Sequence, residues 1–441
     1  MPLVFVHGVS VRAGPSYERQ QRFRDAAFRR HVLPRQDTPI HNPYWGDVGA
    51  KAAWNHASLP GDPLLVLEAL GPQETVTVEQ VLISEEAAGY TQPDSVLLDV
   101  ARQDFQEAID LLVSSAIEES GIDARALVAV ASELSDYAER NPSPAWISQV
   151  GHDHAFLDRL REETRMESVE RGNGAPRPDD QRTAPRQGEQ PAANRAGEQA
   201  GPRATERRTG RTGGALIAPP PFDPGPTLQE QLDVWDALAR AIERVREAVA
   251  DWRWGQPGRS LRRLVQPYLT HFVGDIFVYL KERGTPARPG AIIERVSDAI
   301  AAAAREVRPG DPLIIVAHSM GANVVYDVLT SFLKGVRVDT LVTVGNQIGW
   351  FEEMKLFAAS DPAVPGPHRS RVARPVGVGR WLNVIDTSDY LAYAAEPIFD
   401  GVEDVTFTTG RGPLAAHTEY FKDVGFFQRL GAWLWREAEV F

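Results

Sequence analysis

The chain contains no cysteine among its 441 residues. This absence excludes disulfide bonds, thiol chemistry and cysteine-based metal sites, and it is compatible with a reducing compartment. Long apolar runs are missing too, since no stretch approaches the ~20 apolar residues that a membrane-spanning helix needs. Residues 1–8 also lack the charged start and long apolar core of a signal peptide. We therefore expect a cytoplasmic protein without a transmembrane segment.

Positive charge is in the minority, with 47 Lys and Arg against 60 Asp and Glu and a net charge of −13. Such a balance disfavours nucleic acid as a partner, because the phosphate backbone attracts cationic surfaces. In contrast, apolar residues make up 43% of the chain, which is enough for a sizeable core. The length suits two domains or one domain with a large insertion.

The most informative stretch lies between residues 311 and 333. The apolar run 313–317 predicts a strand buried on both faces, and apolar residues recur at helical spacing after Gly321. Between strand and helix stands Ala317-His318-Ser319-Met320-Gly321. This matches the nucleophile elbow G-x-S-x-G, with alanine at the first small position. In such an elbow a sharp turn exposes the serine, and small neighbours avoid collisions.

Strands and helices alternate at the beginning and the end of the chain. The alternation predicts an α/β fold with a mostly parallel central sheet flanked by helices, formed by residues 1–47 and 261–441. The expected strands are 3–6, 39–44, 313–317, 338–344, 381–386 and 402–408, and the expected helices are 16–33, 265–283, 290–307 and 419–437, besides the elbow helix.

Residues 48–260 interrupt this alternation. Within them the segment 167–226 is rich in Pro, Gly and Arg and nearly free of apolar side chains, so we expect a disordered linker there. The rest, 48–166 and 227–260, is predicted to form a mainly helical cap or lid. We expect a strand over 75–83 and amphipathic helices over 95–119, 123–139 and 227–252, the last packing its apolar stripe onto the core.

A serine becomes a nucleophile when a base takes its proton, and the base needs a carboxylate to orient it. Where the serine stands on such an elbow, the chain order is serine, acid, histidine. Two histidines follow Ser319. His368 lies in a proline-rich loop, whereas His417 follows strand 402–408 at the edge of the sheet that the elbow faces. We expect His417 to be the base.

Two aspartates qualify as the acid. Asp386 ends strand 381–386, and Asp389 lies in the loop just beyond it. Asp389 is favoured, because the acid more often lies in the loop, and Asp386 stays as the alternative. Either one that does not serve as the acid would cap a turn or a short helix.

An oxyanion formed on the substrate needs hydrogen-bond donors. One is the backbone N–H of Met320, which follows the serine. The other is expected from the loop after strand 3–6, as the N–H of Val9, with His7 ending the strand and Gly8 allowing close approach of the backbone.

Together these motifs resemble the α/β-hydrolase superfamily, and its lipase/esterase branch in particular. The resemblance covers roughly 1–47 and 265–441 and omits 48–260. Near the N-terminus, Val4-Phe5-Val6-His7-Gly8 is similar to the oxyanion strand of lipases. The elbow 317–321 and the strand and turn 341–346 also resemble theirs. Asp389-Tyr390-Leu391 stands where many members have Asp-Pro-Val, and His417 with Tyr420 is similar to their His-x-x-Tyr.

We expect the chain to depart from the larger members of this superfamily, because the predicted oxyanion strand begins at residue 3 and the strands that precede it there would be missing. Two short motifs, Trp45-Gly46-Asp47 and Gly274-Asp275, recur in uncharacterised bacterial hydrolases of this type. From them we expect Trp45 to form a wall of the substrate pocket and Asp275 to pack a helix.

The motifs and the resemblance imply a serine hydrolase that cleaves small-molecule or lipid esters through an acyl-enzyme on Ser319. An acyltransferase or a peptidase with the same triad is the alternative, as is an effector hydrolase regulated by a protein partner that binds residues 48–260. We expect no cofactor and no metal, because His152-Asp153-His154 has no further ligands nearby in the sequence.

Overall fold

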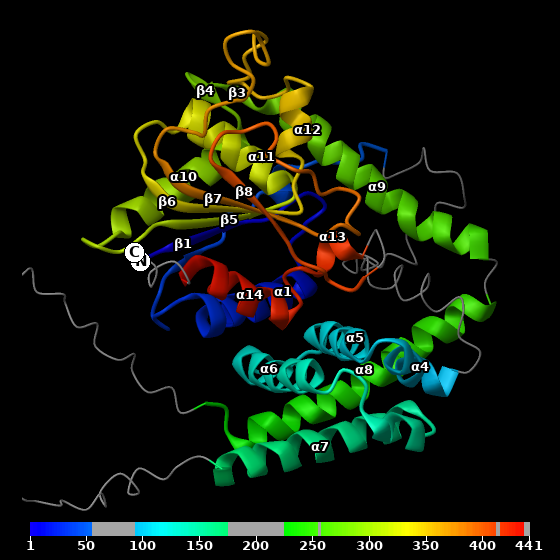
Figure 1. Ribbon diagram of the computed structural model, residues 1–441. Coiled ribbons are helices and arrows are strands. Elements are labelled where there is room, and N and C mark those ends of the chain that lie inside the picture. The colour runs from blue at the N-terminus through cyan, green and yellow to red at the C-terminus, as the bar shows by residue number, and fades with distance from the viewer. Residues whose placement is uncertain (55–92, 175–224, 255–256, 412–414, 436–441) are drawn as a thin grey trace, which may run out of the picture.

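The computed structural model describes residues 1–54, 93–174, 225–254, 257–411 and 415–435. At its centre lies a six-stranded sheet in the order β2-β1-β5-β6-β7-β8, in which every neighbouring pair is parallel (Figure 1). The expected α/β fold with a parallel sheet is thereby confirmed. The strands are β1 (Leu3–Val6), β2 (Ile40–His41), β5 (Ile314–His318), β6 (Val338–Val344), β7 (Val378–Ile385) and β8 (Val402–Thr406).

Both faces of the sheet are buried. Successive side chains of a strand point to opposite faces, so Leu3 and Phe5 of β1 join one hydrophobic cluster while Val4 and Val6 join the other. A parallel sheet covered on both sides requires such apolar strands. Because all six strands run in the same direction, their carboxyl ends meet at one edge of the sheet.

Helices cover the two faces. On one face lie α10 (Ala291–Glu306), α11 (Met320–Asp327) and α12 (Ile348–Glu353), and on the other lie α1 (Pro15–Ala27) and α14 (Val424–Trp435) (Figure 1). The short helix α13 (Ala416–Glu419) precedes α14. The long helix α9 (Pro257–Glu282) runs past the edge where the strands end and is followed by a small hairpin of β3 (Gly284–Thr285) and β4 (Arg288–Pro289).

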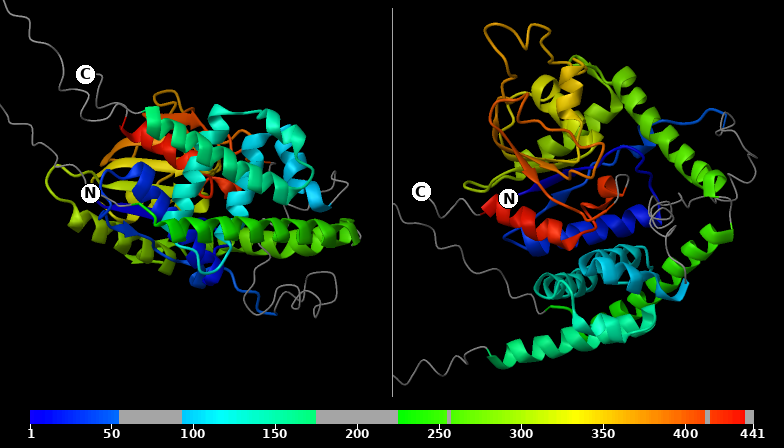
Figure 2. Two further views of the ribbon diagram at one scale, coloured as in Figure 1. Left: turned by 90° about the horizontal axis from the view of Figure 1, so that it is seen from below. Right: turned by 45° about the vertical axis from the view of Figure 1, so that its right-hand side comes forward.

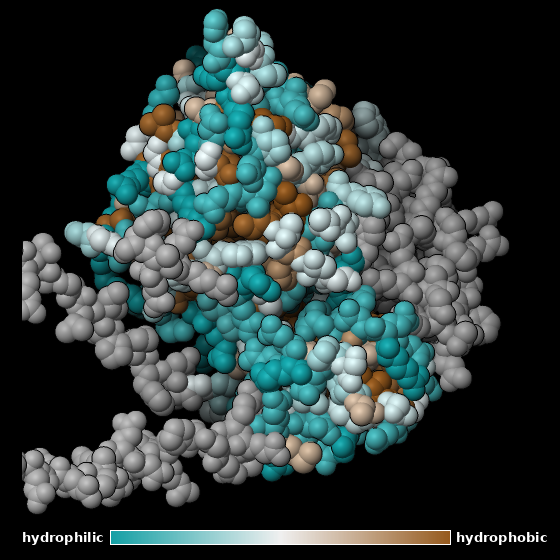
Figure 3. Space-filling model, in the orientation of Figure 1, coloured by the Kyte–Doolittle hydropathy of each residue, from teal (hydrophilic) through white to brown (hydrophobic). Residues whose placement is uncertain are grey.

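The inserted helices form a third layer, on the side of α1 and α14 away from the sheet (Figure 2, right). They are α4 (Val96–Gln103), α5 (Phe105–Ile117), α6 (Ala124–Arg140), α7 (Asp153–Gly174) and α8 (Leu228–Trp254), with short turns at Pro93–Ser95 and Ala145–Gln149. Their apolar side chains belong to the same cluster as one face of the sheet. The surface of this layer that Figure 3 shows is largely hydrophilic. None of the helices among the described residues is long and apolar enough to cross a membrane.

One helix predicted as continuous is divided, and the helix expected over 419–437 begins later than predicted. Asp104 interrupts the helix expected over 95–119, and its carboxylate accepts the N–H of Glu107 at 3.1 Å to cap α5. Asp423 likewise accepts the N–H of Gly425 at 2.7 Å at the start of α14. The apolar spacing runs on through such short breaks, so periodicity alone misses them, whereas the capping aspartates mark them.

Other boundaries differ as well. The helix expected over 16–33 ends at Ala27 and continues as a π-helical turn, Phe28–Val32, and the strand expected over 39–44 is reduced to Ile40–His41. Helix α7 extends to Gly174, so it overlaps the start of the linker expected over 167–226. The strand expected over 75–83 and the linker residues 175–224 lie outside the described residues.

Because the inserted layer shares a hydrophobic cluster with the sheet, we expect the two to unfold together. Phe105 is 1% exposed and packs edge-on against Tyr137, Trp146 and Phe156. Phe105→Ala should cost about 3–5 kcal/mol of unfolding free energy and shift one transition seen alike by circular dichroism and tryptophan fluorescence. The control Leu228→Ala removes a side chain that is 73% exposed and should stay within about 0.5 kcal/mol of wild type. Two transitions, of which Phe105→Ala shifts one alone, would contradict this expectation.

Candidate active site

Ser319 occupies a sharp turn between β5 and α11. Its backbone has φ 52° and ψ −132°, in a region that costs a residue other than glycine of order 1–3 kcal/mol. The surroundings hold it there, since the Ser319 N–H donates to the Val344 carbonyl at 2.9 Å. Gly321 follows because a Cβ at this position would lie 2.4 Å from the His7 carbonyl oxygen. The turn places the serine hydroxyl at the N-terminus of a helix, where the helix dipole favours negative charge.

A line of hydrogen bonds joins Ser319 to His417 and Asp389. The His417 Nε2 lies 2.9 Å from the serine Oγ, and its Nδ1 lies 3.0 Å from Asp389 Oδ2 and 3.1 Å from Oδ1. The three side chains come from the β5–α11 turn, the start of α13 and the loop after β7, and all are buried. With Nδ1–H donating to the carboxylate, Nε2 is left to accept the serine proton, which is the geometry of general-base activation.

The structure brings Asp389, and not Asp386, to the histidine. Asp389 also accepts the N–H of Leu391 at 2.8 Å through Oδ1. Asp386 has a different task, because its Oδ2 accepts both the N–H and the hydroxyl of Thr409 at 2.7 Å, and its Oδ1 accepts the N–H of Ser388 at 2.8 Å. Asp386 therefore ties the end of β7 to the loop after β8, as a turn-capping aspartate.

Tyr420 connects the two aspartates. Its hydroxyl donates to Asp389 Oδ2 at 3.1 Å and accepts the backbone N–H of Asp386 at 2.8 Å. Burial, and then the neighbouring Asp389 charge, raise the pKa of the Tyr420 hydroxyl. The phenol therefore stays protonated and keeps donating to the carboxylate that orients His417.

The loop after β1 is fixed by the His7 ring. Nδ1–H donates to the Gly8 carbonyl at 2.8 Å, and Nε2 accepts the Trp45 backbone N–H at 3.2 Å. Burial lowers the pKa of His7 to about 4, so the ring is neutral at pH 7. Each ring nitrogen then has one hydrogen-bond partner. Since C=O and N–H of a trans peptide point in opposite directions, the bond to the Gly8 carbonyl directs the N–H of Val9 away from the His7 ring.

Trp45 lies fully buried against this ring. The two rings stack with centroids 4.9 Å apart and an interplanar angle of 12°, and the indole N–H donates to the His7 carbonyl at 3.1 Å. Trp45, which was expected to form a pocket wall, therefore packs against the His7 ring and stabilises the loop after β1.

Gly8 brings the same loop onto the serine. A Cβ at residue 8 would lie 2.7 Å from the Cβ of Ser319 and 3.2 Å from its Oγ, closer than side chains tolerate. On the other side of the serine, Met320 is the first residue of α11, and the first N–H groups of a helix have no acceptor within it. The loop that carries Val9 and the start of α11 therefore both lie beside Ser319.

Sequence reasoning missed two residues that contact His417. His318 donates from Nε2 to the His417 carbonyl at 2.8 Å, and burial, reinforced by His417, lowers the pKa of His318 to about 3. Phe272 of α9 lies edge-on to the His417 ring, with centroids 6.2 Å apart. His318 occupies a variable position of the elbow motif, and Phe272 is one of many apolar residues of a helix, so neither carries a signal of its own.

Other polar clusters make structural contacts. Among the described residues, no three or more His, Asp or Glu side chains are grouped as metal ligands would be. Within 152–154, Asp153 accepts the N–H of Leu98 at 2.9 Å, and His154 pairs with Glu243 at 2.6 Å. In comparisons with known proteins, no family model and no curated protein matches this chain.

Contact between Gly8 and Ser319 gives a direct test of the site. Gly8→Ala should push the loop away from the serine and slow labelling of Ser319 by a fluorophosphonate probe at least about tenfold, because the Val9 N–H, the expected oxyanion donor, would be displaced. Gly14→Ala is the matched control, since no atom lies within 4 Å of a Cβ there. Circular dichroism would verify that both variants fold, and equal labelling rates for the two would contradict the geometry.

Proposed function

We propose that this chain is a serine hydrolase that cleaves carboxylic esters in the manner of lipases and esterases. The observation that carries the proposal is the line Asp389–His417–Ser319, with contacts of 3.0 Å and 2.9 Å. A neutral serine hydroxyl is a weak nucleophile, and this arrangement is the known means of activating it.

We further propose that the fold is that of the α/β-hydrolases. Support comes from the order of the elements: the nucleophile follows β5 in the middle of the sheet, the acid follows β7 and the histidine follows β8. The chain order serine, acid, histidine is the order known for that fold, and its second oxyanion donor comes from a loop between a strand and a helix, as here between β1 and α1.

In the proposed reaction, His417 takes the Ser319 proton while Oγ attacks the acyl carbon of the ester. The resulting oxyanion is stabilised by the backbone N–H groups of Val9 and Met320, and the imidazolium by its hydrogen bond to Asp389. The imidazolium then gives its proton to the leaving alcohol oxygen, and the acyl group stays on Ser319. Water, deprotonated by His417, attacks the acyl carbon of this acyl-enzyme. The bond to Ser319 Oγ then breaks, His417 returns the proton to Oγ, and the carboxylic acid leaves.

Esters are proposed as substrates because the elbow and the His-Gly loop resemble those of lipases. The same triad would serve acyl transfer or peptide cleavage, and the acceptor is decided by the pocket above it. Rates measured with an added alcohol as competing acceptor, and with a matching p-nitroanilide in place of the ester, would separate these activities.

Substitution of the triad and its neighbour tests the proposal. Ser319→Ala should reduce hydrolysis of p-nitrophenyl butyrate to background, and Asp389→Asn should lower kcat by about 10³–10⁴ because the imidazole loses its orienting partner. Asp386→Asn is the matched control, since Asp386 is equally buried but bonds Thr409. It should keep kcat within about tenfold of wild type. Hydrolysis that persists in Ser319→Ala, or a larger loss of kcat in Asp386→Asn than in Asp389→Asn, would contradict the proposal.

A further inference from the structure

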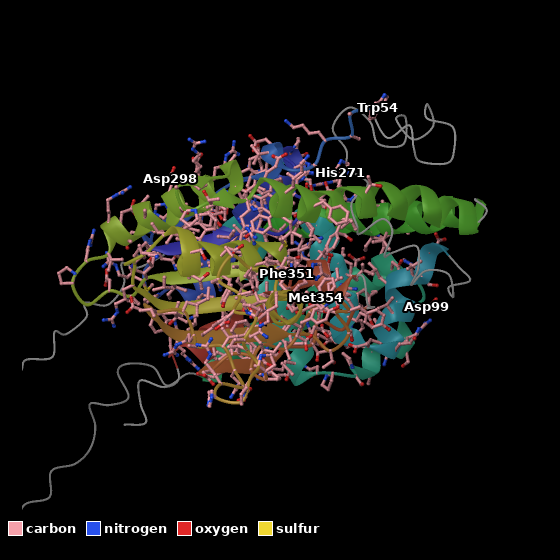
Figure 4. All side chains as sticks on the ribbon, turned by 90° about the horizontal axis from the view of Figure 1, so that it is seen from above. Trp54, Asp99, His271, Asp298, Phe351 and Met354 are labelled. Carbon is pink, nitrogen blue, oxygen red and sulfur yellow. The ribbon has the colours of Figure 1, made fainter. Side chains whose placement is uncertain are left out.

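Helix α9 contacts two parts of the candidate active site, and the far end of the elbow helix, along one face. Phe272 meets the His417 ring, Asp275 reaches the loop after β1, and the Tyr279 hydroxyl donates to Asp327 at the end of the elbow helix α11. Residues three and four apart lie on one side of a helix, so these contacts share a single stripe. Figure 4 labels His271, the neighbour of Phe272, on this stretch of α9.

The Asp275 carboxylate is completely buried, and each of its oxygens accepts two hydrogen bonds. Its Oδ2 accepts the N–H of Ser10 at 2.8 Å and Arg12 Nη1 at 3.0 Å. Its Oδ1 accepts the N–H of Ala50 at 2.6 Å and Arg12 Nη2 at 2.8 Å. A bidentate arginine is the strongest kind of partner for a buried carboxylate, and it compensates for removing the charge from water.

The surrounding backbone approaches Asp275 unusually closely. A Cβ at Gly49 would lie 2.4 Å from Asp275 Oδ1, and a Cβ at Gly274 would lie 2.8 Å from the Cβ of Ala50. Glycines at both positions therefore let α9 dock on the loops that follow β1 and β2. This goes beyond the helix packing expected for Asp275, because the carboxylate joins three segments distant in sequence.

These contacts determine where the Val9 N–H points. On one side of Val9, the Gly8 carbonyl is bonded to the His7 ring. On the other side, the N–H of Ser10 is bonded to Asp275, and Ser10 has φ 61°, a conformation that only a few per cent of residues other than glycine adopt. With the peptide groups on both sides of Val9 bonded, its own N–H has a single direction.

We propose that Asp275 is a positioning residue of the oxyanion hole, which holds the N–H of Val9 in place through Ser10 and Arg12. The inference rests on the proposed function, since it assigns a role in stabilising the oxyanion of that reaction. Such a donor stabilises the transition state and contributes little to binding of the substrate in its ground state. Its misplacement should therefore lower kcat and leave KM unchanged.

Asp275→Asn tests the inference, because it keeps the size of the side chain and removes the charge and half of the acceptor capacity. We expect kcat for p-nitrophenyl butyrate to fall about tenfold to a hundredfold with KM within about twofold. The inhibition constant of a trifluoromethyl ketone, whose adduct with Ser319 carries an oxyanion, should rise by a similar factor.

Asp327→Asn is the control for stability alone. Asp327 is also completely buried and is bonded to Tyr279 of α9 and, at 2.8 Å, to Arg283 directly after that helix, but none of these bonds goes to the loop after β1. It should lower the melting temperature and leave kcat and the inhibition constant within about twofold of wild type.

If Asp275→Asn does not fold, Arg12→Gln, at a side chain that is 23% exposed, should shift kcat and the inhibition constant in the same direction by a smaller factor.

The outcomes separate the two proposals. If Ser319→Ala abolishes hydrolysis while Asp275→Asn keeps kcat and the inhibition constant, the positioning role is wrong and the proposed function stands. The positioning role is equally wrong if Asp275→Asn and Asp327→Asn lower kcat alike. Hydrolysis that survives Ser319→Ala overturns both.

Discussion

The pairing of β1 with β5 is the constraint on which the candidate site depends. The two strands lie some three hundred residues apart in the chain, and their register sets Val6 opposite Ala317. Because of this register the loop after β1 lies beside Ser319, with Gly8 against the serine and Gly321 against the His7 carbonyl. A slip of one residue would turn every side chain of β1 to the other face of the sheet, so the two hydrophobic clusters enforce the alignment.

Around this pairing, buried polar groups are matched with partners. His7, His417 and Asp389 are almost excluded from water, and each has hydrogen bonds that define its orientation and, for the histidines, the tautomer. Groups held in this way interact more strongly than they would in water, and unpaired ones would cost stability. The same bonds that stabilise the fold thus orient the groups that would react.

Much of this site can be predicted from short motifs in the sequence. The elbow, His417 and the loop with Gly8 can be predicted because each lies at or after the end of a strand, and parallel strands bring those ends together. Asp386 and Asp389 are three residues apart, and only the path of the loop after β7 separates them. The contacts of Asp275 with the loop after β1 and of Phe272 with His417 cannot be read in this way, because they arise from the docking of α9, which is determined by contacts distant in the chain. The helices of the third layer can be predicted from their apolar stripes, but their place against α1 and α14 cannot, since an apolar stripe does not determine which surface it covers.

The central claim is that Ser319 carries the acyl group of an ester during turnover. Rapid mixing with a p-nitrophenyl ester, followed by an acid quench and mass spectrometry of the peptides, tests it most directly. We expect a burst of about one equivalent of p-nitrophenol per protein and the mass of the acyl group on the peptide that contains Ser319. Turnover of the ester with the acyl group on another residue, unchanged by Ser319→Ala, would contradict it.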